Sequence, residues 1–209
     1  MKKTTIILSL FILFSCTSNN DKIIADPITG FTLNIKDEYT ELNKNELLER
    51  FLSSHKETPE FEEIGYDKKE LIKTYNNRPN TIFLHLEKNN TNYLEASTFP
   101  IYKEYQNDPK KEKGYVDMMY DYIKENVLIE IRSANLTQKN LKEDLKEIDK
   151  KDFRHFSMDI FRNDSLIANQ SFYIGAVNEG VVFLKIRSSQ NDFKLDIDKS
   201  ILKAEIIEN

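Results

Sequence analysis

Residues 156–187 read FSMDIFRNDSLIANQSFYIGAVNEGVVFLKIR, and this stretch decides the fold. Apolar and polar residues alternate in its first part, which is the period of a half-buried β-strand. Asn163-Asp164 and Asn178-Glu179-Gly180 then interrupt the apolar runs with residues that favour turns. The pattern predicts three antiparallel strands in a row, at residues 156–162, 166–174 and 181–187.

Four earlier stretches also have the composition of strands. Phe31 to Ile35 follows Gly30 and alternates apolar with polar residues. Residues 81–87 and 93–99 are separated by a short polar segment, so we expect them to form a hairpin. Residues 127–133 read VLIEIRS, a run rich in branched apolar side chains, and predict one further strand.

Helix start signals occur at five places. Asn43 and Asp67 each stand three residues before a glutamate, which is the spacing of a capping box. Asp108-Pro109 puts a capping residue before a proline, an arrangement typical of a first helical turn. Two more helices are predicted from residue 136 to 148 and from 197 to 202. The helix that begins at Pro109 is expected to end near Asn126.

These elements together predict an α+β fold. The sequence contains about seven strands, which short connections make mostly antiparallel, and four or five helices. Such a set forms a twisted sheet with helices packed against it. No repeat, low-complexity tract or long linker divides residues 30–209, so we expect one domain there.

The helix predicted from Pro109 to Asn126 has more apolar surface than one core face needs. Its tyrosine, methionine, valine and isoleucine side chains cover an arc of about 200°, whereas a core-facing stripe needs little more than about 100°. One interpretation is a helix buried on two sides. The other is that Tyr115, Met118 and Tyr122 form a partner surface, since aromatic residues and methionine are enriched in interface cores.

The N-terminus has the features of an export signal. Lys2 and Lys3 precede a short apolar run from Ile6 to Phe14, which is too short to span a bilayer. The run ends in Leu13-Phe14-Ser15-Cys16 and so resembles a bacterial lipoprotein signal peptide, although Phe14 is bulkier than the usual residue there. The resemblance implies that residues 1–15 are removed and that Cys16 is acylated. Residues 16–29 would then be a lipidated tether.

The composition agrees with export and excludes some functions. Cys16 is the only cysteine, so its use in acylation leaves no thiol for a disulfide. The formal charge of the whole chain is −5, and removal of two lysines with the signal would make it more acidic. We therefore expect no nucleic acid partner, because phosphate binding needs a clustered basic surface. No second apolar segment is long enough to cross a bilayer.

Motifs of enzyme chemistry are absent from the sequence. The five glycines stand too far apart for a phosphate-binding loop or a dinucleotide fingerprint, and no G-x-S-x-G nucleophile elbow occurs. His55, His85 and His155 show no metal-ligand spacing, so we predict no metal, no cofactor and no catalytic residue. The densest acidic cluster, Glu60 to Glu63, is better explained as a solvated loop than as a pair of catalytic carboxylates.

Both ends of the predicted domain resemble one known fold. The opening GFTLNI at residues 30–35, the three-strand meander and the closing DFKLDIDKSILKAEI at 192–206 look like the PsbP-like fold. That group includes DcrB-type envelope lipoproteins and the extrinsic PsbP subunit of photosystem II. Its members often carry proline and tryptophan after the first strand, and this chain has no tryptophan. The resemblance implies a PsbP-like α/β sandwich with a binding or accessory role.

The function expected from the sequence is that of a lipid-anchored, non-enzymatic protein of the cell envelope. Its partners would be the membrane, through acylated Cys16, and another protein or an extracytoplasmic ligand. Thr17 is not the aspartate that retains some lipoproteins in the inner membrane, so by analogy the outer membrane is favoured. Two alternatives are an immunity protein against a secreted toxin and a hydrolase that uses unrecognised carboxylates.

Overall fold

The computed structural model describes residues 21–43, 45–49, 81–106 and 108–207. Its centre is an antiparallel sheet with the strand order β3-β4-β5-β9-β8-β7-β6. The strands of this sheet are β3 (Thr40–Glu41), β4 (Thr81–Asn89), β5 (Asn92–Pro100), β6 (Thr137–Ile148), β7 (Lys151–Arg162), β8 (Ser165–Val177) and β9 (Gly180–Ser188).

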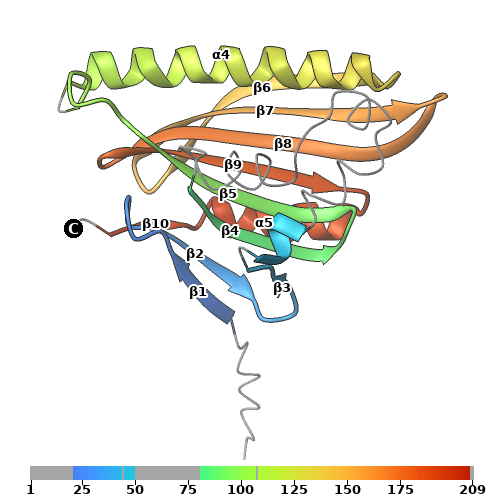
Figure 1. Ribbon diagram of the computed structural model, residues 1–209, viewed down its shortest axis with the longest axis horizontal. Helices are drawn as coiled ribbons and strands as arrows, with labels where there is room; N and C mark the ends of the chain where they lie inside the picture. Colours follow the sequence, from blue (N-terminus) through green and yellow to red (C-terminus); the bar gives the residue numbers. More distant parts are fainter. Residues whose placement is uncertain (1–20, 44, 50–80, 107, 208–209) are drawn as a thin grey trace, which may run out of the picture.

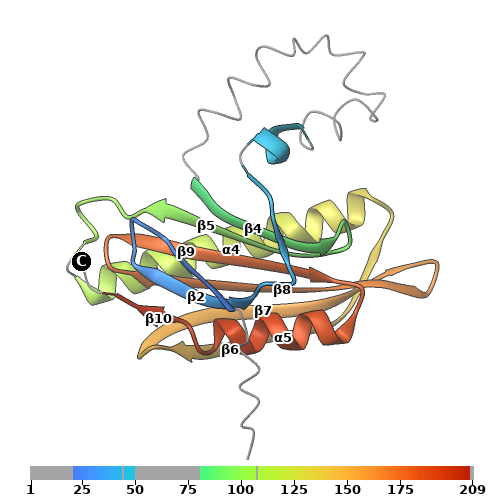
Figure 2. The same cartoon turned by 90° about the horizontal axis from the view of Figure 1, so that it is seen from below.

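One layer covers each face of this sheet (Figures 1 and 2). The long helix α4 (Pro109–Ser133) crosses one face. The other face carries helix α5 (Asn191–Ile201) and a small antiparallel sheet of order β1-β2-β10. The small sheet consists of β1 (Asp21–Ala25), β2 (Phe31–Lys36) and β10 (Glu205–Ile206). This arrangement confirms the predicted α+β sandwich.

The predicted three-strand meander is confirmed as β7, β8 and β9. Successive side chains of these strands point to opposite faces of the sheet and so belong to two separate hydrophobic cores. Phe172 and Ile174 of β8 point to the α4 side, while Tyr173 between them points to the α5 side. Phe156 stacks on Phe172 under α4, with ring centroids 4.4 Å apart. On the other side, Phe31 of β2 packs near Phe153 of β7. Both faces of these strands are therefore apolar, which explains their near-continuous hydrophobic runs.

Polar contacts hold α4 to the sheet beside its apolar face. Asp108 caps the helix as predicted, since its side chain accepts hydrogen bonds from two first-turn amides. Farther along, the hydroxyl of Tyr120 donates to Glu143 of β6 at 2.6 Å, and Arg154 of β7 lies over the Tyr120 ring. Burial and this carboxylate raise the pKa of Tyr120. The helix therefore has one defined rotation about its axis.

The prediction of a strand at residues 127–133 is wrong, because α4 continues without a break to Ser133. Val116, Tyr120 and Ile131 are buried, and Ile123 and Val127 pack beside them. These positions recur every three or four residues, so one apolar stripe runs through the whole helix. The sheet supplies apolar contacts along its full length, and this packing overrides the strand preference of branched residues.

The helix predicted at residues 136–148 is also wrong, because this segment is strand β6. It pairs with β7 from Thr137 opposite Phe161 to Ile148 opposite Lys151. A bulge interrupts the register near Asn140, whose φ is +55°. β6 is an edge strand and almost entirely exposed, so its charged residues lack the alternation of a half-buried strand. Backbone pairing with β7 therefore makes residues 137–148 a strand instead of the predicted helix.

Several local predictions are confirmed. β4 and β5 form the expected hairpin, and β2 is the strand predicted after Gly30. Asn43 accepts hydrogen bonds from the amides of Asn45 and Glu46, and the Glu46 carboxylate accepts from the Asn43 amide at 2.7 Å, which completes the capping box. The start signal at Asp67 and the Glu60 to Glu63 cluster lie outside the described residues.

Two boundaries differ from those expected. α5 begins at Asn191, six residues before the predicted start, because Phe193 already packs into the core together with Ile197 and Ile201. At the other end of the chain, residues 21–25 of the predicted tether form β1, which pairs with β2. Part of the tether therefore belongs to the small sheet.

A buried carboxylate joins the two sheets. Asp26, with 1% of its surface exposed, follows β1 and accepts hydrogen bonds from Thr29, through both its amide and its hydroxyl. It also accepts one from the hydroxyl of Thr98 on β5 at 2.7 Å. A side chain at Gly180 would collide with the methyl groups of Thr29 and Thr98. Glycine there allows β9 to pass close to this junction.

Replacing Asp26 should destabilise the whole domain. In Asp26→Ala the two threonine hydroxyls and a buried amide lose their acceptor, which should lower the free energy of unfolding by about 2–4 kcal/mol. Urea unfolding followed by circular dichroism measures the change. Asp121→Ala, at an exposed position of α4, is the control and should change stability by no more than about 0.5 kcal/mol. Equal stability of the two variants would contradict this role of Asp26.

Candidate functional site

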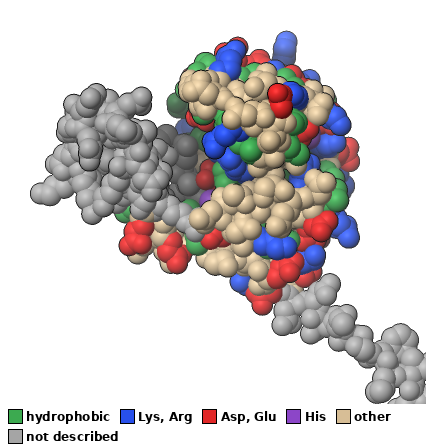
Figure 3. Space-filling view, turned by 90° about the vertical axis from the view of Figure 1, so that its right-hand side faces the viewer, with side chains coloured by type: hydrophobic (Ala, Val, Ile, Leu, Met, Phe, Trp, Pro, Cys, Tyr) green, Lys and Arg blue, Asp and Glu red, His purple; other side chains and the backbone are tan. Residues whose placement is uncertain are grey.

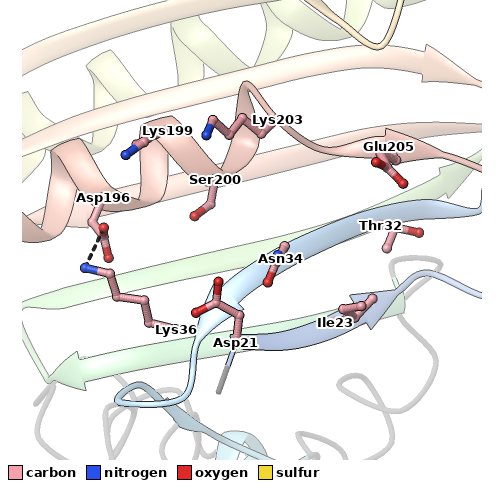
Figure 4. A pocket seen from close by; sticks show the side chains of 10 residues that line it. All are labelled: Asp21, Ile23, Thr32, Asn34, Lys36, Asp196, Lys199, Ser200, Lys203 and Glu205. Atoms are coloured by element: carbon pink, nitrogen blue, oxygen red, sulfur yellow. Dashed lines mark ion pairs between the residues drawn. The ribbon is translucent and has the colours of Figure 1, made fainter. Parts of the chain in front are cut away.

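A polar groove lies between α5 and the outer face of the small sheet (Figure 4). Its volume is about 550 Å³. Figure 4 shows side chains from α5 along one wall and side chains from β1 and β2 along the other. The residues that line it are Asp21, Ile23, Thr32, Asn34, Lys36, Asp196, Lys199, Ser200, Lys203 and Glu205.

Local periodicity explains why these side chains meet. Residues 196, 199, 200 and 203 follow the i, i+3, i+4, i+7 spacing and so share one polar side of the end of α5 and of the turn that follows it, next to the buried side of Phe193 and Ile197. In β2, Leu33 and Ile35 point into the core, so Asn34 and Lys36 point outward. Helix α5 and strand β2 thus each turn a polar face to the same groove.

Asp196 is the fixed centre at one end of the groove. Its carboxylate accepts from Lys36 Nζ at 2.8 Å and from the Tyr39 hydroxyl at 2.5 Å. Partial burial acts to raise the pKa of Asp196, but the hydrogen bonds from Lys36 and Tyr39 outweigh it and hold that pKa below its usual range. Burial and the same carboxylate raise the pKa of Tyr39, which therefore stays protonated.

The remaining charges of the groove are not paired. Lys199 and Lys203 on the α5 side, and Asp21 and Glu205 on the sheet side, make no ion pair within 4 Å among the described residues. The floor between them is neutral, formed in part by Asn34. The groove therefore presents two cations and two carboxylates to solvent outside direct ion pairs, although Lys199 acts on Asp196 and Asp21 acts on Lys36 over longer distances.

A second hollow, of about 630 Å³, lies between the start of α5 and strands β6 to β8. Its polar groups are largely bonded to one another. Asp159 accepts from the amide groups of both Asn140 and Asn169, and Lys194 pairs with Asp198 at 2.7 Å. Although this hollow is the larger of the two, it offers fewer unpaired charges to a ligand, and the groove beside β1 is the better candidate.

The predicted partner surface on α4 divides into two parts. Met118 and Tyr122 are exposed over 59% and 70% of their surface, so they point away from the sheet. Tyr115 is half-buried and packs between Tyr105, at 5.6 Å between ring centroids, and Tyr102, at 6.0 Å. At Met118 and Tyr122, α4 is therefore not covered on its second side by any described part of the chain.

Two residues extend this surface that the sequence did not point to. Ile129 is exposed over 51% of its surface and lies on the same side of α4 as Tyr122, two turns later. Because the sequence predicts a strand at residues 127–133, it could not indicate that Ile129 shares one side of a helix with Tyr122. Tyr102, which is 65% exposed, precedes α4 and joins it only through the tyrosine cluster. We call Tyr102, Tyr115, Met118, Tyr122 and Ile129 the outer α4 surface.

The described histidines are held in structural contacts. His155 lies 2.6 Å from Asp144 through Nδ1 and packs against Tyr173, and burial holds its pKa below the usual value. Its Nε2 has almost no accessible surface. His85 stacks on Tyr93 of β5. Across the described part of the chain, no three histidine, cysteine or acidic side chains are grouped so that they could hold a metal ion.

The surface charge is mixed in sign. Figure 3 shows lysine and arginine side chains interspersed with aspartate and glutamate over the visible described face. A nucleic acid surface needs clustered cations, and this face does not present them. Within the described residues, no helix combines the length and apolar character needed to cross a bilayer.

Comparison with solved structures identifies the fold. The chain is similar to the solution structure of cyanobacterial PsbP (CyanoP) from Synechocystis sp. PCC 6803, with a TM-score of 0.56 over 93% of this chain and 99% of that chain. This chain has a PsbP-like fold. The sequence identity is 7%, so the likeness concerns the fold alone. No protein-family model matches the sequence, and a search of curated proteins finds no match.

The Asp196 contacts predict a specific pH dependence of stability. The pKa of Asp196 in the folded protein lies below the value of about 3.9 for an unfolded aspartate. The charge of Asp196 therefore contributes fully to the free energy of unfolding above about pH 3.9. This contribution is lost as the pH falls through the pKa of the folded state. Asp196→Asn should therefore lower the urea midpoint at pH 7, and the difference from the unaltered protein should shrink below about pH 4.

Tyr39→Phe is the matched control for this measurement, because it removes one of the two hydrogen bonds and leaves the carboxylate in place. It should show a smaller loss at pH 7 than Asp196→Asn. A loss in Asp196→Asn that stays constant from pH 7 to pH 3 would contradict a stabilising role of the charge.

Proposed function

We propose that this protein is a lipid-anchored, non-enzymatic component of the cell envelope that binds another protein through the outer α4 surface. The PsbP-like fold is consistent with an accessory role of this kind. The observation that carries the proposal is that the start of the described chain and the outer α4 surface lie on opposite sides of the central sheet (Figure 1). The described chain begins at β1, on the side of the sheet opposite to α4 (Figure 1).

The short distance along the chain to Cys16 gives this placement a consequence. Four residues separate Cys16 from Asp21, the first residue of β1, so five Cα-to-Cα steps connect them. Even fully extended, they span about 18 Å at most. An acylated Cys16 would hold the small-sheet layer next to the membrane, and α4 would face away from it. The outer α4 surface would then be the part of the domain that other envelope proteins meet.

The side chains of the outer α4 surface suit protein binding. Tyrosine and methionine are enriched at the centres of interfaces, where large side chains bury area at little conformational cost. Met118, Tyr122 and Ile129 lie within about 40° of one another around the helix axis and form a single row. Asp121 and Glu125 are exposed carboxylates on the same side of the helix. Asp121 lies beside this row and Glu125 lies within it, between Tyr122 and Ile129, so a partner must also accommodate that negative charge.

The described polar groups support a non-enzymatic role. The aspartate–histidine pair of Asp144 and His155 resembles part of a catalytic constellation, but Nε2 of the histidine is closed to solvent and could not exchange a proton with a substrate. In the groove, Asp196 is held ionised by Lys36 and Tyr39, which suits a binding contact better than acid–base catalysis.

Acylation of Cys16 can be tested on the native protein. We expect the mature N-terminal peptide to begin at Cys16 and to carry the mass of its attached fatty chains. Cys16→Ala should leave the signal uncleaved by the lipoprotein pathway, and the same variant begun at residue 16 should shift out of the detergent phase, because it has neither fatty chains nor the apolar run Ile6 to Phe14. Mass spectrometry and phase partitioning give the two readings. A bare thiol in the mature native protein would overturn the anchoring proposal.

The outer α4 surface can be tested by cross-linking in the native envelope followed by identification of the captured protein. Met118→Lys combined with Tyr122→Ser should reduce capture of the specific partner at least about tenfold, since central interface residues often contribute 2 kcal/mol or more. Both side chains are exposed, so stability should change little.

Leu166→Ser is the matched control for this experiment, because Leu166 is 55% exposed but lies in the β7–β8 hairpin. Partner capture should be unaffected by it. If the double variant on α4 still captures its partner fully, the binding surface lies elsewhere. A secreted toxin as the captured protein would identify an immunity protein.

A further inference from the structure

We propose that the side of the domain opposite α4 rests on a lipid bilayer and inserts four aliphatic side chains among the headgroups. They belong to Ile23, Leu195, Leu202 and Ile207, which we call the lipid-facing residues. This inference rests on the proposed anchoring at Cys16 and deepens it, because a single attachment point does not set the orientation of a domain. Contact through four further side chains fixes how the domain stands on the membrane.

The strands of the small sheet turn two of these side chains outward. Ile24 of β1 and Ile206 of β10 pack against the core. Because successive side chains of a strand point to opposite faces, their neighbours Ile23 and Ile207 point away from the core. Ile23 is exposed over 74% of its surface and Ile207 over 54%. The outer face of the small sheet therefore presents two isoleucines to its surroundings.

Helix α5 turns the other two side chains outward. Leu195 and Leu202 are seven residues apart and so lie on one side of the helix, away from the buried Phe193 and Ile197. Leu195 is exposed over 65% of its surface and Leu202 over 45%. Figure 2 looks onto this side of the molecule, where α5 and the small sheet lie next to each other in front of the central sheet. The lipid-facing residues therefore share the outer side of one layer.

The position of the attachment point selects a bilayer as the occupant of this side. Asp21 follows Cys16 by five Cα-to-Cα steps, which span about 18 Å at most. Asp21 and Ile23 belong to the same strand of the outer layer. Fatty chains inserted in a membrane would therefore hold this layer within reach of the headgroups. A partner protein would have to enter the gap between the layer and the membrane before it could cover the lipid-facing residues.

The chemistry of this side also suits a bilayer. The lipid-facing residues are all isoleucine or leucine, whereas the outer α4 surface carries the tyrosine and methionine that are enriched in protein interfaces. Lys199 and Lys203 stand beside the two leucines, and their aliphatic stems can lie among the apolar groups while the ammonium groups stay at the headgroups. Asp21 and Glu205 balance these two charges. The contact therefore depends on apolar insertion and does not require anionic lipid.

The cysteine content allows a direct test on the acylated protein. Cys16 is the only cysteine, and its sulfur cannot react with a thiol label once it carries a fatty chain. One introduced cysteine is then the only labelled site. The variants Ile23→Cys, Leu195→Cys, Leu202→Cys and Ile207→Cys each receive a small fluorophore and are reconstituted into vesicles of phosphatidylethanolamine with phosphatidylglycerol. Met118→Cys and Tyr122→Cys on α4 are the matched controls, because both positions are exposed on the opposite side.

The quenching pattern decides the orientation. Phospholipids that carry a nitroxide should quench the four lipid-facing labels severalfold more strongly than the α4 labels, and iodide in the water should do the reverse. Vesicles of phosphatidylcholine alone should give the same contrast. Equal quenching by lipid on both sides would overturn the proposal. So would a contrast that requires phosphatidylglycerol, which would assign the contact to the lysines, and so would protection from iodide without quenching by lipid, which would indicate a second copy on this side.

Charged substitutions test whether the aliphatic side chains themselves make the contact. With the label at Ile207→Cys, the pair Ile23→Asp and Leu195→Asp should lower quenching by lipid by at least about half, because two of the four inserted side chains become charged. Leu145→Asp with Leu166→Asp is the matched control, since both leucines are 55% exposed but lie on β6 and β8. It should leave the quenching unchanged. Unchanged urea midpoints show that each variant is folded, and equal quenching in both pairs would overturn the proposal.

Failure of this inference can be distinguished from failure of the anchoring. Acylation is measured independently, from the mass of the native N-terminal peptide. An acylated protein whose labels show no contrast between the two sides would leave the anchoring intact and overturn the lipid-facing assignment. A bare Cys16 thiol in the native protein would overturn the anchoring itself, and this inference with it.

Discussion

The position of the small sheet against the central sheet depends on the hydrogen bonds to the buried Asp26 carboxylate. The small sheet has few residues and a short β10, so its own pairing could not fix its position. Asp26 connects the turn after β1 directly to Thr98 in the central sheet. Asn178 adds a contact from the β8–β9 turn to the Thr29 carbonyl oxygen. Glycine at positions 30 and 180 leaves room for this junction, because a Cβ at either would collide with neighbouring atoms.

The molecule has two faces with different chemistry, one on each side of the central sheet. On one side, α4 covers the sheet and turns large apolar side chains outward. On the other, α5 and the small sheet form a polar groove of mixed charge. The central sheet between them is apolar on both faces, so each layer packs on its own core. A change in one surface can therefore leave the other intact.

Much of the fold could be predicted from local pattern. The strands β7, β8 and β9 alternate in register with the pleat and end at turn residues, and the capping signals at Asn43 and Asp108 correspond to real hydrogen bonds. Prediction failed where tertiary contacts decided between helix and strand. Residues 127–133 became helical because the sheet offered apolar contacts to a long helix, and 137–148 became a strand because β7 offered an unpaired edge.

The candidate site was predictable only in part. The surplus of apolar residues on α4 was visible in the sequence, and the structure separates Met118 and Tyr122 from the buried Tyr120. The groove joins residues near the two ends of the chain, so no local pattern could place Asp21 opposite Lys199. The spacing of Asp196, Lys199, Ser200 and Lys203 was the one available signal, since it marks a polar stripe on a short amphipathic helix.

The exposed edge of the central sheet at β6 has a consequence for how copies of this chain can meet. A bare row of amide and carbonyl groups at the edge of a sheet invites pairing with the edge of a second copy, and repeated pairing builds fibres. Lysines 139, 142 and 146 and the bulge near Asn140 make β6 a poor template for a second copy. The same residues that obscured the strand in the sequence therefore disfavour edge-to-edge pairing of one copy with another.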